Sequence, residues 1–316
     1  MEISVVTPAY NEEHNLPLLY ERLRATMRKL GITWEWIVID DRSRDATFAV
    51  VGDLAKKDPA VRGIRFSRNF GSHAAITCGL AKCTGRAAIV LAADLQDPPE
   101  TVPNLLEEWR AGAKVVWAAR RQRLGESRRT ILSARIYYWF MRNMPEMQVM
   151  PANGADFFLL DRVVIDALGG INDKNTSIMA LITWLGFEQK VVEYDKQARM
   201  HGETGWTFSK KLKLAVDSIT GFSYFPIRFI SLVGLFIACC GFIAAAVVVY
   251  NSLMRDLVTG WPSIMVALLV LNGLQMLMLG VLGEYIWRGL DETRSRPKYI
   301  VQEMINAAPV ASKLSD

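Results

Sequence analysis

Two long apolar stretches without charges constrain this chain more than any other feature. Phe229–Tyr250 and Pro262–Gly283 each run for 22 residues without a charged side chain. At about 1.5 Å per helical residue, a stretch of this length spans about 33 Å, and a bilayer core is about 30 Å thick. Helices buried in a large soluble domain are the alternative, but such helices rarely run this far without a charge. The sequence therefore predicts a transmembrane helical hairpin over residues 229–287.

Basic residues flank this hairpin on both sides, whereas its connector holds only Arg255 and Asp256 as charged residues. By the positive-inside rule, residues 1–208 and the C-terminal tail 288–316 lie in the cytoplasm. Before the first stretch, residues 209–228 carry apolar side chains at helical spacing beside several lysines. This pattern predicts an amphipathic helix on the membrane surface, and a surface helix packed on the soluble domain is the alternative.

Residues 1–208 alternate strand and helix patterns. Short β-branched runs separated by helical stretches are typical of an α/β domain with a doubly wound, mostly parallel sheet. The predicted strands are Ile3–Thr7, Trp36–Ile39, Val61–Phe66, Ala87–Ala92 and Val115–Ala118, with a helix over Glu12–Leu30. In such sheets, ligands bind beyond the carboxyl ends of the strands.

Polar clusters follow four of these strands. They are Tyr10-Asn11-Glu12, Asp40-Asp41, Ser67-Arg68-Asn69 and Asp94-Leu95-Gln96-Asp97. The chain has neither a GxGxxG turn after the first strand nor a GxxxxGK loop, which argues against a Rossmann dehydrogenase and a P-loop NTPase. Carboxylates repel phosphates unless a divalent cation lies between them, so Asp94 favours Mg²⁺ or Mn²⁺ bridging a diphosphate. For Asp97, a turn or helix-capping role before Pro98 is the alternative.

Charge and cysteine content exclude other classes of function. The chain has 37 Lys and Arg residues against 32 Asp and Glu residues, a net charge of +5 that is too small to imply nucleic acid. Its four cysteines lack the paired spacing of a disulfide framework or a zinc site.

Several motifs together resemble a known family. Val6-Thr7-Pro8-Ala9-Tyr10-Asn11-Glu12-Glu13, Ile39-Asp40-Asp41-Arg42-Ser43 and Ala93-Asp94-Leu95-Gln96-Asp97-Pro98-Pro99 resemble the family 2 glycosyltransferases of the GT-A fold. Further blocks, from Phe66-Ser67-Arg68-Asn69-Phe70-Gly71 to Arg296-Pro297-Lys298-Tyr299 after the hairpin, are similar to polyisoprenyl-phosphate glycosyltransferases, a group that includes dolichol-phosphate mannose synthase. The likeness covers nearly the whole chain.

The resemblance implies a membrane-bound inverting transferase that moves a sugar from a nucleotide-sugar, a UDP-sugar by preference, to undecaprenyl phosphate or a related polyprenyl phosphate. It implies nucleotide binding by Pro8, Tyr10, Asn11, Glu12, Asp40, Asp41 and Arg68. Asp94 and Gln96 would face Mg²⁺ or Mn²⁺ and the diphosphate. Asp94 and Asp156 would act in catalysis, with Asp156 either as a base or as an orienting group. Arg120, Arg129, Ser133 and Arg199 would bind the lipid phosphate, although Arg121, Arg123 and Arg128 are equally available.

The same likeness implies a multi-pass protein of the bacterial inner membrane that contacts membrane lipids and forms a homo-oligomer, a tetramer by analogy. A processive polysaccharide synthase would need a Gln-x-x-Arg-Trp element and more spans, which this sequence lacks. Two departures from the family pattern matter: Ala92 stands where many relatives carry an acid, and Phe158 replaces an arginine expected near the reaction centre. They leave a second hypothesis open, a catalytically inactive, membrane-anchored scaffold that binds nucleotide.

Overall fold

The computed structural model describes residues 1–121, 157–171, 177–197, 260–294 and 296–306, together with part of residues 230–250. The chain forms two compact units. One unit comprises Met1–Ala215 and Pro297–Asp316, and the other comprises Val216–Arg296. Residues 297–306 therefore belong to the unit that also holds the N-terminal strands, which the sequence analysis did not foresee.

An eight-stranded sheet forms the centre of the first unit, in the order β7-β5-β6-β4-β1-β2-β3-β8. The strands are β1 (Ile3–Ala9), β2 (Trp34–Asp40), β3 (Val61–Phe66), β4 (Ala87–Val90), β5 (Val115–Arg120), β6 (Phe157–Asp161), β7 (Gln189–Tyr194) and β8 (Val301–Ile305). β4, β1, β2 and β3 pair in parallel, as do β5 and β7, whereas β6 and β8 run antiparallel to their neighbours. The mostly parallel α/β sheet is thus confirmed.

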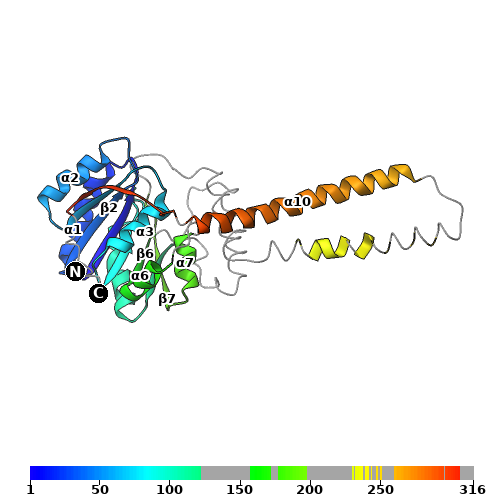
Figure 1. The fold of residues 1–316 in the computed structure, drawn as a ribbon. Helices are drawn as coiled ribbons and strands as arrows, with labels where there is room; N and C mark the ends of the chain where they lie inside the picture. Colours follow the sequence, from blue (N-terminus) through cyan, green and yellow to red (C-terminus); the bar gives the residue numbers. More distant parts are fainter. Residues whose placement is uncertain are drawn as a thin grey trace, which may run out of the picture. The chain divides into compact units, whose positions relative to one another are not determined.

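Helices cover both faces of this sheet (Figure 1). Alternate residues along β1 and β2 enter two hydrophobic clusters, because successive side chains of a strand point to opposite faces. The first cluster contains residues of α1 (Asn15–Leu30), α2 (Thr47–Lys57) and α4 (Val102–Arg110), which follows a short 3-10 turn, η1 (Pro99–Thr101). The second contains residues of α3 (Ser72–Lys82), α6 (Arg162–Gly169) and α7 (Ile178–Trp184).

The second unit contains α10 (Trp261–Thr293), a helix of 33 residues, and helical residues between 230 and 250. A Cβ atom on Gly234 would lie 2.9 Å from Met278 Cε, so this glycine lies close to α10. Among the residues that the structure describes, no helix is long and apolar enough to cross a membrane. The amphipathic helix expected over 209–228 lies outside the described residues.

Candidate active site

Four parallel strands end side by side at one edge of the sheet. In the registers of β1, β2 and β3, Ala9 lies beside Asp40, and Asp40 lies beside Arg65. On the other side of β1, Val6 lies beside Val90, the last residue of β4. The polar loops that follow these strands therefore emerge next to one another, as the sequence predicted for this sheet.

Hydrogen bonds join the loop after β1 to the loop after β2. The Asn11 N–H donates to Ser43 Oγ at 2.9 Å, and Asn11 Oδ1 accepts from the Arg44 N–H at 2.9 Å. The Glu12 N–H donates to Thr47 Oγ1 at 2.8 Å. These bonds fix the backbone on which Tyr10, Asn11 and Glu12 are carried.

Asp40 ends β2 with its side chain fully buried. Its Oδ1 accepts from the Ser43 N–H at 2.8 Å, and its Oδ2 lies 3.1 Å from Arg65 Nε, an ion pair without hydrogen-bond geometry. In this arrangement Asp40 shapes the loop after β2 and presents no exposed surface to a ligand. Its predicted contact with a nucleoside stays a prediction.

Asp41 holds the loop after β3. One carboxylate oxygen accepts from the Phe70 N–H at 2.6 Å and the other accepts from the Gly71 N–H at 2.8 Å. Burial raises the pKa of the Asp41 carboxyl above its ordinary value, although these two hydrogen bonds oppose the rise. Through Asp41, the segment that carries Arg68 is tied to the end of β2.

Other predicted nucleotide residues are open to solvent. Tyr10 is 41% exposed, Asn11 and Arg68 are also exposed, and Pro8 and Glu12 are half-buried. The Arg68 guanidinium carbon lies 4.6 Å from the centre of the Phe70 ring, a cation–π contact. An aromatic ring can stack on a base and a guanidinium can bind a phosphate, so these residue types suit the predicted nucleotide role, which stays a prediction.

In the loop after β4, half-buried and buried side chains alternate from Asp94 to Asp97. Leu95 and Asp97 are 1% exposed, whereas Asp94 and Gln96 are half-buried. Asp94 Oδ1 accepts from the Gln96 N–H at 3.2 Å. The buried Leu95 and Asp97 side chains therefore anchor the loop. Asp94 and Gln96, which are predicted to face the metal, remain partly open to solvent.

Positive φ angles mark three of these strand ends. Asn11 has a φ of 59°, Arg42 one of 63° and Leu95 one of 58°, in the loops that follow β1, β2 and β4. Residues other than glycine avoid this region of φ, because adopting it costs about 1–3 kcal/mol for each residue. Such backbone strain is concentrated at functional sites. The left-handed backbone conformation of Arg42 and Leu95 was not predicted from the sequence, because nothing in these residue types signals it.

The donor set of the loop after β4 fits a divalent cation that is shared with a ligand. Asp94 offers a carboxylate and Gln96 an amide oxygen, both hard donors of the kind Mg²⁺ and Mn²⁺ prefer. Within the described parts of the chain, no group of three or more His, Cys, Asp or Glu residues is placed to hold a metal ion. The resemblance would place an acid at position 92, where this chain has alanine, so a cation here would take its remaining ligands from a diphosphate and water.

Residues expected at the acceptor side are described only in part. Arg120 ends β5 at the same edge, beside Tyr194 of β7. Asp156, Arg129, Ser133 and Arg199 lie outside the described residues. Asp156 directly precedes Phe157, the first residue of β6, which pairs with Ala118 near the end of β5.

The structure places Phe158 in the core of the first unit. This side chain is fully buried, and its ring centre lies 5.2 Å from that of Trp117 in the second hydrophobic cluster. Position 158 therefore faces the core, since residues of a strand alternate between faces. The phenylalanine packs in the cluster that also holds residues of α3 and α6, and its expected effect near the reaction centre stays a prediction.

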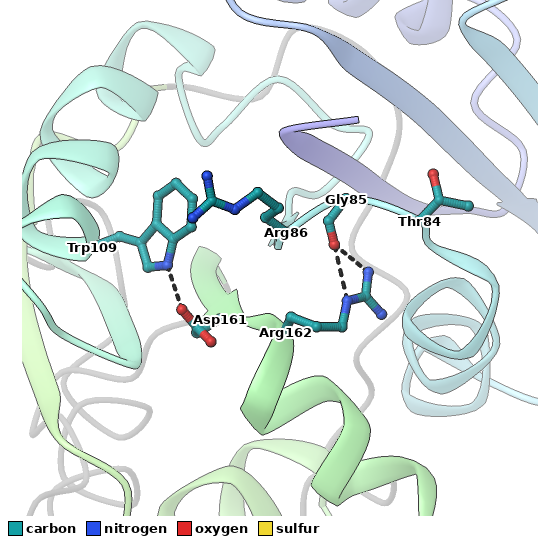
Figure 2. A pocket seen from close by; sticks show the side chains of 6 residues that line it. All are labelled: Thr84, Gly85, Arg86, Trp109, Asp161 and Arg162. Carbon is teal, nitrogen blue, oxygen red and sulfur yellow. Dashed lines mark hydrogen bonds between the residues drawn. The ribbon is translucent and has the colours of Figure 1, made fainter.

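A cavity of about 340 Å³ lies at the other edge of the sheet, where β4 begins (Figure 2). Its polar groups bond to one another: the Trp109 Nε1–H donates to Asp161 at 2.8 Å, and Arg162 donates to the Gly85 carbonyl. The predicted site residues described above follow the carboxyl ends of the strands and do not line it. We therefore regard this cavity as part of the packing at the amino end of β4.

Comparison with known proteins agrees with the geometry. Residues 4–169 match the family described as "Glycosyl transferase family 2". The chain is 38% identical to "Uncharacterized glycosyltransferase YkcC" of Bacillus subtilis, over 96% of this chain and 94% of that protein. It is 37% identical to "Prophage bactoprenol glucosyl transferase homolog" of Escherichia coli, over 96% of this chain and 99% of that protein.

Among solved structures, one similar chain is glucosyl-3-phosphoglycerate synthase from Mycobacterium tuberculosis, in complex with Mn²⁺, UDP-glucose and phosphoglyceric acid. Its identity is 16% and its TM-score 0.48, over 68% of this chain and 76% of that chain. The family match and the near full-length relatives confirm the resemblance seen in the motifs. This chain belongs to glycosyl transferase family 2 and is a glycosyltransferase.

Proposed function

We propose that this glycosyltransferase moves a sugar from a nucleotide-sugar, a UDP-sugar, to the phosphate of a polyprenyl lipid such as undecaprenyl phosphate. The observation that carries the proposal is the loop after β4, in which Leu95 and Asp97 are buried while Asp94 and Gln96 stay partly open to solvent. Relatives named bactoprenol glucosyl transferase, aligned along nearly the whole chain, support a polyprenyl phosphate as acceptor.

The proposed transfer inverts the anomeric carbon. An oxygen of the acceptor phosphate attacks that carbon from the side opposite the nucleotide, and the bond from the carbon to the diphosphate oxygen breaks. The nucleoside diphosphate leaves with the bonding electron pair. The acceptor is a phosphate monoester with a second pKa of about 6, so it is mostly a dianion at pH 7 and needs little deprotonation.

This chemistry assigns separate tasks to the site residues. Asp156 orients the acceptor or stabilises charge near the anomeric carbon, and a role as general base is the alternative. Arg120 lies at the edge where the acceptor phosphate would have to bind, and arginine suits a phosphate through bidentate contacts. Arg129, Ser133 and Arg199 are proposed to complete that phosphate site.

Asp94 and Gln96 would hold the divalent cation together with the diphosphate of the donor. When bound, Mg²⁺ or Mn²⁺ would neutralise charge on the departing diphosphate. The Asp94 carboxylate and the half-buried Gln96 amide would orient the diphosphate relative to the acceptor, which the fixed backbone of their loop favours.

The proposal includes attachment to the bacterial inner membrane through the apolar stretches 229–250 and 262–283, with residues 209–228 on the membrane surface. A polyprenyl phosphate cannot leave the bilayer, so the crevice has to be held against it. Large apolar side chains of the helical unit are exposed, among them Leu232 (69%), Phe236 (68%) and Met276 (71%). Exposed apolar surface of this kind requires lipid or protein cover, which also supports the proposed homo-oligomer.

The test uses the purified full chain and measures release of the nucleoside diphosphate from a panel of UDP-, GDP- and dTDP-sugars. Each reaction is run with and without undecaprenyl phosphate, and with Mg²⁺, Mn²⁺ or a chelator. We expect release that needs both the lipid and the metal. Asp94→Asn should lower kcat by about 10²–10³-fold, as loss of one group that stabilises developing charge does.

Asp53→Asn is the matched control, because Asp53 is an exposed aspartate of α2 that pairs only with neighbouring Lys56 in the described contacts. It should turn over like the unaltered chain. Nucleotide binding without turnover across the whole panel would refute the transferase reaction proposed here and favour the non-catalytic scaffold, with Ala92→Asp as the variant to examine next.

A further inference from the structure

The end of β7 is fastened to the loop after β4, although β5 and β6 separate these two strands in the sheet. Tyr194, the last residue of β7, donates its hydroxyl hydrogen to Asp97 Oδ1. Three residues later, the Gln197 N–H donates to the Gln96 carbonyl at 2.9 Å. One bond holds the peptide that joins Gln96 to Asp97, and the other holds the Asp97 side chain that follows it.

Burial keeps the Tyr194–Asp97 pair together. Asp97 is 1% exposed and Tyr194 is 5% exposed. A buried carboxylate that loses a hydrogen-bond donor is costly, so separation of the pair is disfavoured. The Tyr194 ring also packs edge-on against Phe157, with centres 5.9 Å apart and planes at 82°, which fixes the direction of the phenol.

The loop needs such anchors because of its backbone. Leu95 adopts a φ of 58°, and a leucine keeps this conformation only where its surroundings hold it. Its buried side chain is one anchor, and Asp97 is the other. Gln96 lies between the two anchors and Asp94 directly precedes Leu95, so the positions of the Asp94 and Gln96 side chains depend on both anchors.

Tyr194 also adjoins the acceptor side of the site. It is the register partner of Arg120, and the Arg121 N–H donates to the Tyr194 carbonyl at 3.0 Å. Its ring contact, Phe157, directly follows Asp156 in the sequence. One side chain thus contacts the donor loop and lies next to the strand ends that carry two predicted acceptor residues.

We propose that Tyr194 and Asp97 are positioning residues: their hydrogen bond holds Asp94 and Gln96 in place for the metal and diphosphate, and aligns that loop with the strand end that carries Arg120. The inference rests on the proposed function, since it assigns the loop to the donor diphosphate. Asp97 is thereby more than a turn or capping residue. Neither residue touches a reacting atom.

The experiment compares Tyr194→Phe with Tyr20→Phe. Tyr20 is 4% exposed and donates its hydroxyl hydrogen to the half-buried Asp58 Oδ2 at 2.8 Å, so both changes delete one tyrosine–aspartate bond made by a buried tyrosine. Tyr20 lies on α1, and Asp58 follows α2 before β3 begins, away from the strand ends of the site. A loss that reflects stability alone would be shared by the two variants.

The first readout is binding of UDP to the full chain by calorimetry at increasing Mn²⁺, which does not depend on turnover. Tyr194→Phe should raise the Mn²⁺ concentration for half-maximal UDP binding about tenfold, the effect of one lost hydrogen bond, and Tyr20→Phe should leave it unchanged. The second readout is transfer to undecaprenyl phosphate, where kcat should fall with the KM for the lipid unchanged. Asp97→Asn retains an acceptor oxygen and should bind like the unaltered chain, whereas Asp97→Ala should match Tyr194→Phe.

The inference would be overturned if Tyr194→Phe and Tyr20→Phe needed the same Mn²⁺ concentration for half-maximal UDP binding. If Tyr194→Phe does not fold, the comparison of Asp97→Asn with Asp97→Ala decides, and equal Mn²⁺ requirements in that pair would overturn it as well. The proposed function fails separately, when the unaltered chain binds UDP with Mn²⁺ but transfers no sugar to the lipid. An unaltered chain that shows no effect of Mn²⁺ on UDP binding would refute the assignment of the loop itself.

Discussion

Replacing Asp41 by asparagine tests how firmly the segment after β3 must be held for the nucleotide to bind. The Asp41 carboxylate is 4% exposed, and its two oxygens accept from the Phe70 and Gly71 N–H groups at 2.6 and 2.8 Å. An asparagine can satisfy one of these donors with its oxygen, but it turns its own NH₂ group toward the other. The variant therefore loses one charge-assisted bond and leaves one N–H group without its acceptor.

Such a bond contributes about 1.5–3 kcal/mol. In the variant, this free energy is no longer available to hold the segment that carries Arg68 and has to come from nucleotide binding. The affinity for UDP then falls by about 10- to 100-fold, since 1.4 kcal/mol corresponds to a factor of ten. Isothermal titration of the full chain with UDP in the presence of Mn²⁺ measures this loss. Urea unfolding of the same samples measures how much of this free energy is lost from the overall stability of the protein.

Asp161→Asn provides the matched control. Asp161 accepts from the Trp109 Nε1–H at 2.8 Å and the Val163 N–H at 3.1 Å, at the other edge of the sheet (Figure 2). We expect it to lose stability and to keep its affinity for UDP. Unchanged UDP binding in Asp41→Asn, or an equal loss in the control, would refute the reasoning that Asp41 acts through the segment after β3.

Two further variants test the packing of the domain. Burial acts to raise the pKa of Glu35, but hydrogen bonds from its neighbours, among them Ser4 and Arg62, outweigh it and leave this pKa below its ordinary value. The carboxylate therefore adds stability above about pH 4.3, which is lost as the pH falls through the lower folded-state pKa; Glu35→Gln should make the urea midpoint less dependent on pH between 5 and 3, and an unchanged slope would contradict this. Gly79→Ala should lower the free energy of unfolding in urea by about 1–3 kcal/mol, because the new Cβ would lie 2.2 Å from Val6 Cγ1. This cost should outweigh the higher helix propensity of alanine. A gain in stability would contradict the observed packing.

The strands of the sheet differ in how clearly the sequence marks them. β1 to β5 are apolar runs that end at polar or charged residues, so their existence followed from pattern alone, with their ends shifted by a few residues. β7 has a half-exposed pattern, and β8 follows a long helix at the end of the chain, so neither shows the buried run of a central strand. β6 is such a run and was missed, and its antiparallel direction depends on a connection that no local pattern specifies.

The candidate site shows a similar division. Residue types at the strand ends predicted which loops form it, because carboxyl ends of parallel strands meet at one edge. The conformation within each loop was not predictable in this way. The expected contact of Asp40 with a nucleoside stays a prediction, but neither its full burial beside Arg65 nor the left-handed turn at Leu95 has a signal in the residue itself. Both outcomes depend on tertiary contacts.

The position of β8 has a consequence for how the chain is made. Phe66 of β3 pairs with Val301 of β8, more than 200 residues later, so the helical unit is an insertion between two parts of one sheet. At a synthesis rate of about 5–20 residues per second, the outer edge of β3 waits about 10–50 s for its partner strand. Gln302 then accepts a hydrogen bond from Arg42, directly after the Asp40-Asp41 pair. The nucleotide side of this domain is therefore completed only after the helical unit has been synthesised, so a chain that stops before it leaves an unfinished sheet with an open edge.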